Sequence, residues 1–298
     1  MKKIIVITGG AGFVGTNMIN YFLKKTKLNL ISIDNYSSGS KKNHINNKRV
    51  KYIKADTKDI SKILNKYRND INSLFHFGEF SRIYQSFLKI NECVTSNTTG
   101  SYEVFSFCLK NNIKLLYSAT SATIGNSGND KNLSPYAFTK SKNLELLENY
   151  KRWFGFKFEV IYFYNVYGPM QISKGQMATV IGIFEECYKQ NAFLPVVRPG
   201  NQSRNFTHID DTIKVCLEAL SKNNCQHYSI SNKKSYTILQ VAKMFSAKIK
   251  LYPERPGERY KSSIINKNLN NKIINRFGKI DLKQYVKSFK NSLIAKKD

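Results

Sequence analysis

The sequence has few cysteines and no long apolar segment. Its five cysteines are odd in number, scattered along the chain and never spaced as a CxxC pair. This pattern excludes a disulfide framework and a cysteine-based zinc site, so we expect no metal and a reducing, cytoplasmic location. No run approaches the roughly 18 apolar residues of a transmembrane helix, and we expect no membrane partner. The apolar run from Ile4 to Ile7 stops at Gly9, too early for a signal peptide.

Acidic residues are scarce as well. The chain of 298 residues has 20 Asp and Glu against 48 Lys and Arg, a formal net charge of +28. Such a surplus makes nucleic acid, anionic membranes and phosphorylated ligands worth testing as partners. However, 39 of these residues are lysines spread along the whole chain beside abundant Asn and Ile, as a genome-wide compositional bias also produces. No basic run is interleaved with aromatic residues, so we expect no nucleic-acid partner.

Short apolar runs alternate with amphipathic segments through the first half of the chain. The runs of strand length are 4–8, 28–34, 50–55, 73–77, 114–118 and 158–164. Segments with helical periodicity lie between most of them, at 14–25, 60–67, 99–109 and 136–154. This alternation is typical of a parallel sheet with helices on both faces. We therefore predict an α/β fold with a doubly wound parallel sheet.

The alternating pattern loosens after residue 165. Glycines and prolines punctuate the chain there, and one further strand–helix pair near 206–220 precedes a strand near 228–231. We expect residues 1–165, with 205–232 returning to them, to form a dinucleotide-binding Rossmann domain. Residues 166–204 and 233–298 are then expected to form a smaller C-terminal lobe that binds the substrate.

A glycine-rich turn follows the first predicted strand. Residues 9–15 read GGAGFVG and lead directly into a predicted helix. Glycines allow a tight turn and a close approach of the backbone to a pyrophosphate, which the N–H groups of the helix N-terminus then bind. Asp34 ends the second predicted strand, where a carboxylate binds both ribose hydroxyls and repels a 2′-phosphate. The pattern favours NAD over NADP, although Lys41 and Lys42 lie close in sequence.

A tyrosine and a lysine lie four residues apart near the start of a predicted helix. Tyr136 and Lys140 follow Ser134 and Pro135, and this spacing places both side chains on one helical face. A free tyrosine titrates at about pH 10 and is a poor base at neutrality, but a nearby ammonium stabilises its phenolate. Thr120 follows the strand at 114–118, so we expect its hydroxyl to face Tyr136 beyond the carboxyl ends of the strands.

These motifs resemble the extended short-chain dehydrogenases/reductases, and within them the nucleotide-sugar epimerase/dehydratase family. The resemblance is greatest to UDP-glucose 4-epimerases and covers essentially the whole chain. Besides GGAGFVG, it rests on IDN at 33–35, AD at 55–56, HFGE at 76–79, NTTG at 97–100, YSATSATIG at 117–125, SPYAFTK at 134–140, YNVYGP at 164–169, RNFTHIDD at 204–211 and RPGE at 255–258.

The resemblance implies a role for each matching residue. Thr120, Tyr136 and Lys140 would be catalytic. NAD would be bound by Gly9, Gly12, Phe13, Val14, Gly15, Asp34, Asn35, Asp56, Thr57, Phe77, Gly78, Asn97, Tyr136 and Lys140. The nucleotide sugar would be bound by Ser81, Thr120, Asn165, Lys174, Arg204 and Arg255. Arg204 and Arg255 would hold its diphosphate, a task that suits a planar bidentate donor.

The residues next to Thr120 bear on the reaction. The family's 4,6-dehydratases have Asp-Glu directly after this threonine, whereas this chain has Ser121 and Ala122. Without that acid and base, dehydration is disfavoured. A 4-epimerase needs only the tyrosine and the cofactor. We therefore expect an epimerase that oxidises C4 of a UDP-hexose transiently and returns the hydride to the other face.

Other interpretations stay open. The stretch GPMQISKGQMATV at 168–180 is similar to ADP-glyceromannoheptose 6-epimerases, in which a lysine at the position of Lys174 is a second acid/base. An NAD(P)H-linked keto-sugar reductase and, last, a non-catalytic polyanion-binding relative are further alternatives. Glu79 and Arg82, in HFGEFSR, replace the small residues usual after the strand at 73–77; by the resemblance they would lie near the nicotinamide or the sugar and define an uncommon substrate, which the sequence does not identify. The resemblance also implies polysaccharide-precursor synthesis and a homodimer formed by the helices at 97–109 and 136–154.

Overall fold

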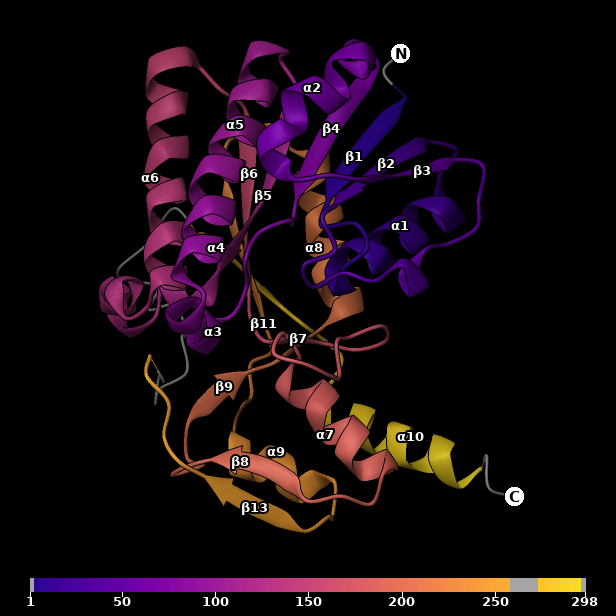
Figure 1. Cartoon of the computed structure of the whole chain (residues 1–298), viewed down its shortest axis with the longest axis vertical. Helices are drawn as coiled ribbons and strands as arrows, with labels where there is room; N and C mark the ends of the chain where they lie inside the picture. The colour runs from indigo at the N-terminus through magenta and orange to yellow at the C-terminus, as the bar shows by residue number, and fades with distance from the viewer. Residues whose placement is uncertain (1–2, 258–272, 296–298) are drawn as a thin grey trace.

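A computed structural model describes residues 3–257 and 273–295. Its centre is a sheet of eight strands in the order β14-β11-β6-β5-β4-β1-β2-β3, in which every neighbouring pair is parallel (Figure 1). The strands are β1 (Ile4–Thr8), β2 (Asn29–Asp34), β3 (Val50–Lys54), β4 (Ile71–His76), β5 (Lys114–Thr120), β6 (Phe158–Phe163), β11 (His227–Ser231) and β14 (Ile273–Phe277). The predicted doubly wound parallel sheet is confirmed.

Helices cover both faces of this sheet, so each face buries its own apolar core. One core packs the sheet against the helices of residues 60–154 and includes Leu64, Phe105 and Leu147. The other packs it against α1 and α8 and includes Phe22 and Ile213. The helices are α1 (Phe13–Lys25), α2 (Ile60–Leu64), α3 (Ile83–Leu88), α4 (Ile90–Val94), α5 (Ser101–Lys110), α6 (Pro135–Phe154) and α8 (Ile209–Ser221).

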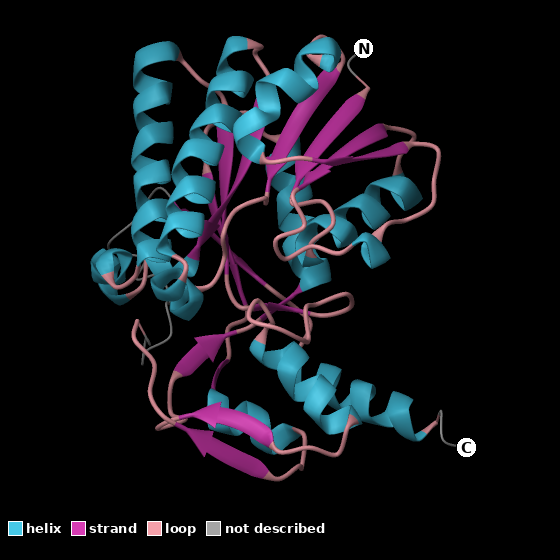
Figure 2. Ribbon diagram, viewed as in Figure 1, coloured by secondary structure: helices cyan, strands magenta, loops and turns pink. Residues whose placement is uncertain are grey.

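A smaller lobe lies beyond the carboxyl ends of the sheet strands (Figure 2). Its core includes Phe184, Val196, Phe245 and Val286 and is separate from the two sheet cores. Three pairs of short strands, β7–β10, β8–β13 and β9–β12, accompany it. Its elements are β7 (Val166–Tyr167), α7 (Val180–Lys189), β8 (Leu194–Val197), β9 (Ser203–Asn205), β10 (Thr207–His208), β12 (Ser235–Thr237), α9 (Ile238–Met244), β13 (Ile249–Tyr252) and α10 (Leu282–Ile294).

The structure differs from the expected domain bounds at β14. We expected all of 233–298 in the smaller lobe, but β14 pairs with β11 and extends the large sheet at its edge. Its sequence, IINRF, is short and stands in a very basic region, so no helix–strand alternation marks it as a sheet strand. β10 likewise lies in the range expected to return to the large sheet, but it pairs with β7 of the smaller lobe. The other bounds of the division stay a prediction.

The strand order predicts a ligand crevice at the carboxyl ends of two central strands. Strand order reverses between β1 and β4, and ligands of open α/β sheets bind beyond the carboxyl ends of the strands at such a point. The chain leaves β1 toward α1 and leaves β4 toward α3, so the two following loops border that crevice. No helix within the described ranges is long and apolar enough to cross a bilayer.

Candidate active site

A cavity of about 800 Å³ occupies the crevice between the sheet and the smaller lobe. Its walls contain most of the residues that the sequence predicted for cofactor, catalysis and substrate. The predicted residues that line it are Gly9, Gly12, Phe13, Val14, Gly15, Asp34, Asn35, Thr57, Phe77, Gly78, Ser81, Thr120, Tyr136, Lys140, Asn165, Arg204 and Arg255. One cavity therefore brings together residues from both lobes.

The glycine-rich turn requires glycine at several positions. Gly9 has φ of 67°, and a Cβ there would lie 2.8 Å from the backbone nitrogen of Gly78. A Cβ on Gly15 would lie 2.2 Å from the carbonyl oxygen of Gly9. The turn is thus packed against the loop after β4 and against the first turn of α1, with room for backbone but not for side chains. This cradle at a helix N-terminus fits the pyrophosphate of a dinucleotide.

Asp34 is anchored at the end of β2 and faces the same cavity. Its Oδ2 accepts the N–H of Ala11 at 3.0 Å, and its Oδ1 accepts the N–H of Tyr36 at 2.8 Å. Burial raises the pKa of Asp34, and these N–H groups oppose the rise. Each oxygen has a second lone pair for a ribose hydroxyl, which fits NAD. The carboxylate would repel a 2′-phosphate.

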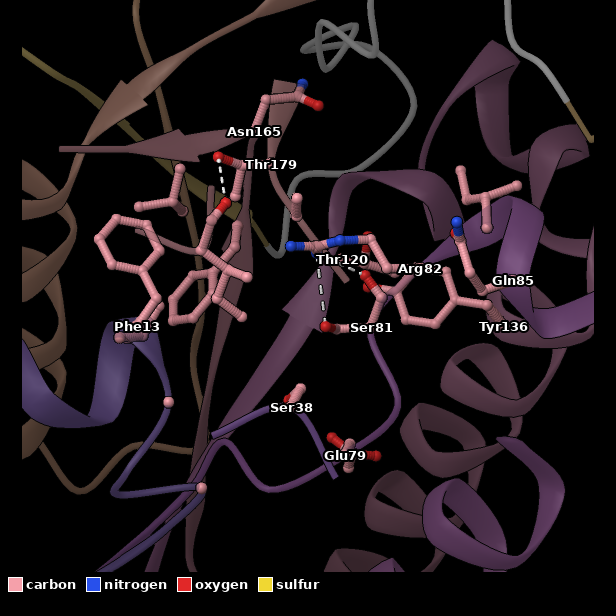
Figure 3. A pocket seen from close by; sticks show the side chains of 18 of the residues that line it. Phe13, Ser38, Glu79, Ser81, Arg82, Gln85, Thr120, Tyr136, Asn165 and Thr179 are labelled. Carbon is pink, nitrogen blue, oxygen red and sulfur yellow. Dashed lines mark hydrogen bonds between the residues drawn. The ribbon is translucent and has the colours of Figure 1, made fainter. Parts of the chain in front are cut away.

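The proposed catalytic hydroxyls lie at the ends of two elements. Thr120 ends β5, and Tyr136 is the second residue of α6, whose N-terminus is capped by Ser134 through the N–H of Ala137 at 3.1 Å. Both side chains line the cavity and appear together in Figure 3. The Tyr136 hydroxyl donates to no acceptor among residues 3–257 and 273–295, so it is available to a bound substrate.

Lys140 lies one helical turn after Tyr136 and is buried. Its ammonium donates to the carbonyl oxygen of Ser118 at 2.6 Å and forms an ion pair with the Glu79 carboxylate. Their side chains are 5% and 1% exposed. An ammonium has three N–H groups, so one is left for the cavity, where the resemblance places the nicotinamide ribose.

Glu79 itself has four partners. Besides Lys140, its Oε1 accepts from the Ser101 hydroxyl at 2.8 Å, the Asn143 amide at 3.0 Å and the Tyr117 hydroxyl at 3.2 Å. Burial raises the pKa of Tyr117 well above its usual range, and the Glu79 charge adds to the rise, so Tyr117 stays a donor. The sequence showed a charge where small residues are usual but did not show this network, because its members come from four separate segments.

Three of the predicted substrate residues approach the cavity from different segments. Asn165 has φ of 32° and donates to the carbonyl oxygen of Asn205 at 2.9 Å, which fastens the crossing between the lobes. Arg204 lies on β9 and is 9% exposed. The guanidinium of Arg255 stacks 5.1 Å from the ring centroid of Tyr84. Glu258, the last residue of the RPGE motif, lies outside the described residues.

Three predicted site residues do not line the cavity. Lys174 is 71% exposed and pairs with Glu186 at 3.0 Å. Asn97 is fully buried, and its amide bonds to both backbone polar groups of Phe80. Asp56 caps the turn after β3 by accepting the N–H of Lys58. In this structure the polar atoms of these three residues contact other groups of the protein, and their contacts with sugar or NAD stay predictions.

The sequence did not predict several of the lining residues as site residues. Arg82 and Gln85 enter from the start of α3, Ser38 from the loop after β2, and Thr179 from the N-cap of α7. Figure 3 shows all four at the cavity. Arg82 was noticed only as an unusual residue, and the other three are common types in loops. Their placement depends on how α3 and the smaller lobe fold over the sheet.

The fold and the site together define an extended short-chain dehydrogenase/reductase that binds NAD. The sequence profile of the NAD dependent epimerase/dehydratase family matches residues 5–232, and the chain belongs to this family.

Similar proteins agree with this assignment. The chain is 27% identical over 240 residues to a putative UDP-glucose 4-epimerase of Methanocaldococcus jannaschii, with 74% of each chain covered. Its fold is similar to a UDP-glucose 4-epimerase of Thermotoga maritima, solved with UDP-glucose, at a TM-score of 0.84 and 24% identity over 97% and 99% of the two chains. It is also similar to a UDP-N-acetylglucosamine 4-epimerase of Methanobrevibacter ruminantium, solved with UDP-N-acetylmuramic acid. The TM-score is 0.82 and the identity 26%, with 97% of this chain and 96% of the other covered.

Proposed function

We propose that the protein is an NAD-dependent epimerase that inverts C4 of the hexose in a UDP-activated sugar. The observation that carries the proposal is the joint placement of Thr120, Tyr136 and Lys140 at one cavity with the glycine cradle. Ser121 and Ala122 follow Thr120, so the acid/base pair of the family's dehydratases is missing from this place. A reaction that needs one tyrosine and the cofactor suits this set of groups.

The residues divide the work as follows. Tyr136 takes the proton of the C4 hydroxyl and later returns it, while Thr120 donates a hydrogen bond to the same oxygen. NAD, when bound, would supply the acceptor and the donor for the C4 hydride, so that the sugar would undergo no net oxidation. Lys140 holds the ribose side of the site, and Arg204 with Arg255 binds the substrate diphosphate as bidentate donors. The keto sugar rotates in the site between loss and return of the hydride, so that its opposite face receives the hydride and C4 is inverted.

The two enzymatic alternatives have less support. A 6-epimerase of the ADP-heptose type would use Lys174 as a second acid/base, but this side chain is exposed and paired with Glu186 outside the cavity. A reductase that uses NADPH would require room for a 2′-phosphate where Asp34 stands. We further propose that the protein is a homodimer that acts in the cytoplasm in the synthesis of polysaccharide precursors, which rests on the family resemblance.

The test is turnover by the purified protein. It is incubated with UDP-glucose, UDP-N-acetylglucosamine, GDP-mannose and ADP-heptose in turn, and product stereochemistry is followed by NMR. The proposal predicts interconversion at C4 of a UDP sugar without added cofactor. The Tyr136→Phe variant should keep its fold by circular dichroism and lose turnover by at least about a hundredfold, the contribution of a general base. Turnover only with added NADPH, or an active Tyr136→Phe protein, would contradict the proposal.

A further inference from the structure

Arg82 extends into the cavity beside the catalytic tyrosine. It is the residue before α3, and its side chain reaches the region of Thr120 and Tyr136 (Figure 3). Its Nε and Nη2 donate to the carbonyl oxygen of Met177 at 3.1 and 2.7 Å, and its Nη1 donates to the carbonyl oxygen of Ser81 at 2.9 Å. A longer contact of Nη1 reaches the Ser81 hydroxyl at 3.4 Å. Of five N–H groups, at least one remains for a ligand.

All of these acceptors are neutral. No acidic side chain in the described part of the chain lies within ion-pair distance of Arg82, although the structure gives ion pairs to Lys140, Lys174 and Arg276. Burial lowers the pKa of Arg82, and the neighbouring Tyr136 opposes this effect. A guanidinium that is partly removed from water without a counter-charge is costly, and an incoming anion relieves that cost.

The remaining charges of the cavity already have roles. Among the residues that the structure describes, the lining holds four cationic residues, Arg82, Lys140, Arg204 and Arg255, and two carboxylates, Asp34 and Glu79. Glu79 neutralises Lys140, and Asp34 stands at the cofactor end of the site. Under the proposed function, Arg204 and Arg255 face the two negative charges of the diphosphate. Arg82 is left at the end where the reacting sugar lies, with no negative charge opposite it.

We propose that Arg82 binds a carboxylate on the sugar, so that the substrate is a nucleotide-linked hexuronic acid rather than a neutral hexose. This inference rests on the proposed function and narrows its substrate class. Carboxylates match the fork of a guanidinium, and a charged hydrogen bond in a partly buried site discriminates strongly against a neutral analogue. The two carbonyl contacts hold the guanidinium in place before the substrate arrives, which lowers the entropic cost of binding.

Binding of matched ligands tests this inference. Titration calorimetry with saturating NAD measures the affinities of UDP-glucuronate, UDP-glucose and UDP for the Tyr136→Phe protein, which is expected not to convert the two sugars. We expect UDP-glucuronate to bind at least about tenfold more tightly than UDP-glucose. Adding Arg82→Met should lower the affinity for UDP-glucuronate about 10- to 100-fold, the range for a hydrogen bond to a charged group. The affinities for UDP-glucose and UDP should stay within about threefold of those of the Tyr136→Phe protein. Arg82→Lys should restore part of the preference.

Arg49 supplies a matched control. Its guanidinium also donates to backbone carbonyls, those of Leu23, Thr26 and Leu28, but it does not line the cavity. Arg49→Met should therefore leave the ratio of the two affinities unchanged. Equal affinities in the parent protein, or equal loss of all three ligands in Arg82→Met, would overturn the inference and show that Arg82 only fastens Met177 or binds phosphate. If neither UDP sugar binds, both the proposed function and this inference fail.

Discussion

At the scale of single residues, the site is organised around a buried charge pair. The Glu79 carboxylate and the Lys140 ammonium share a place from which water is nearly excluded, and neutral donors complete the shell of Glu79. Burying two charges costs several kcal/mol each, which such a pair recovers only with good geometry and further hydrogen bonds. The pair thus holds the Lys140 ammonium one helical turn from Tyr136. Removing either partner alone would leave an unpaired buried charge.

This arrangement predicts strong coupling between the two residues. Glu79→Gln and Lys140→Met should each lower the free energy of unfolding by roughly 3 kcal/mol, because each leaves one buried charge unpaired. The double variant has no unpaired charge and should lose at least about 2 kcal/mol less than the sum. Urea unfolding of the four proteins measures this cycle.

An exposed pair in the same helix is the control. Lys142 and Glu145 form an ion pair at 2.8 Å with side chains 51% and 53% exposed. A cycle of Lys142→Met and Glu145→Gln should give a coupling below about 0.5 kcal/mol, the size typical of such helix pairs. Additive losses at Glu79 and Lys140 would contradict the account of the buried pair.

Residue types and spacing predicted the identity of most site residues but not the direction of every side chain. Tyr136 and Lys140 lie where a four-residue helical spacing places them, and Asp34 lies where a strand must end. Lys174 has the residue type and the motif of an acid/base, yet Glu186 on α7 attracts it outward. That contact depends on the packing of the loop against a helix that no local pattern reveals.

At the scale of elements, a buried histidine joins two strands and a helix of the Rossmann domain. His76 ends β4, and its Nδ1 and Nε2 are hydrogen-bonded to the Thr8 hydroxyl of β1 at 2.7 Å and the Ser101 hydroxyl of α5 at 3.0 Å. Burial lowers the pKa of His76 to about 4, with Lys140 acting in the same direction and Glu79 against it. The imidazole is therefore neutral in the folded protein near pH 7.

Acid should destabilise the fold through this residue. The pKa of an unfolded histidine is about 6.5, so between pH 6.5 and about 4 the unfolded chain binds a proton that the native state does not. The contribution of neutral His76 to the free energy of unfolding is fully present above pH 6.5. It is lost as the pH falls, by up to about 1.4 kcal/mol per pH unit and roughly 3 kcal/mol in total.

Urea unfolding of the parent protein and His76→Gln at pH 7, 6 and 5 isolates this effect. The glutamine does not titrate, so the stability difference between the two proteins should shift by about 1 kcal/mol per pH unit in favour of the variant as the pH falls. A difference that stays constant over this range would show that His76 is not buried in neutral form.

The regular alternation of elements made the core of the fold predictable. The predicted strands of the N-terminal half lie within a few residues of β1 to β6, and the predicted helix at 136–154 differs from α6 by one residue. The short elements were missed: α3 and α4 have six and five residues, and β14 is an edge strand distant in sequence from its partner. Their stability comes from tertiary contacts, which sequence periodicity does not record.

At the scale of the whole molecule, the excess of basic residues separates into two populations. Arginine supplies three of the four cations that line the cavity, and Lys140 is the one lysine among the described lining residues. The other lysines in the described ranges do not line this site, in a chain that has 39 lysines. The net charge of +28 therefore says little about the partner, whereas the cavity arginines match the oxyanions of a nucleotide sugar.

The outer surface of the helical layer fits the proposed homodimer. Helices α5 and α6 lie side by side on one face of the sheet (Figure 1), and Tyr102, Phe138, Trp153 and Phe154 are 47–61% exposed on them. Large apolar side chains exposed along neighbouring helices are typical of an interface. Tyr102→Glu with Phe138→Glu should convert a dimer into monomers in sedimentation velocity, because charges in a buried apolar interface are unpaired.

Phe193→Glu is the control for this prediction. Phe193 is 55% exposed but belongs to the smaller lobe, between α7 and β8. It should leave the sedimentation coefficient unchanged. A parent protein that sediments as a monomer, or a dimer that persists in the double variant, would contradict the proposed interface.

In the proposed reaction, C4 is inverted by removal and return of the same hydride. The direct measurement is NMR of a UDP-hexose or UDP-hexuronate incubated with the purified protein in D₂O, without added cofactor. We expect inversion at C4 with hydrogen, not deuterium, retained on that carbon, and no inversion with Tyr136→Phe. Deuterium at C4, or no inversion of any UDP sugar by the parent protein, would contradict it.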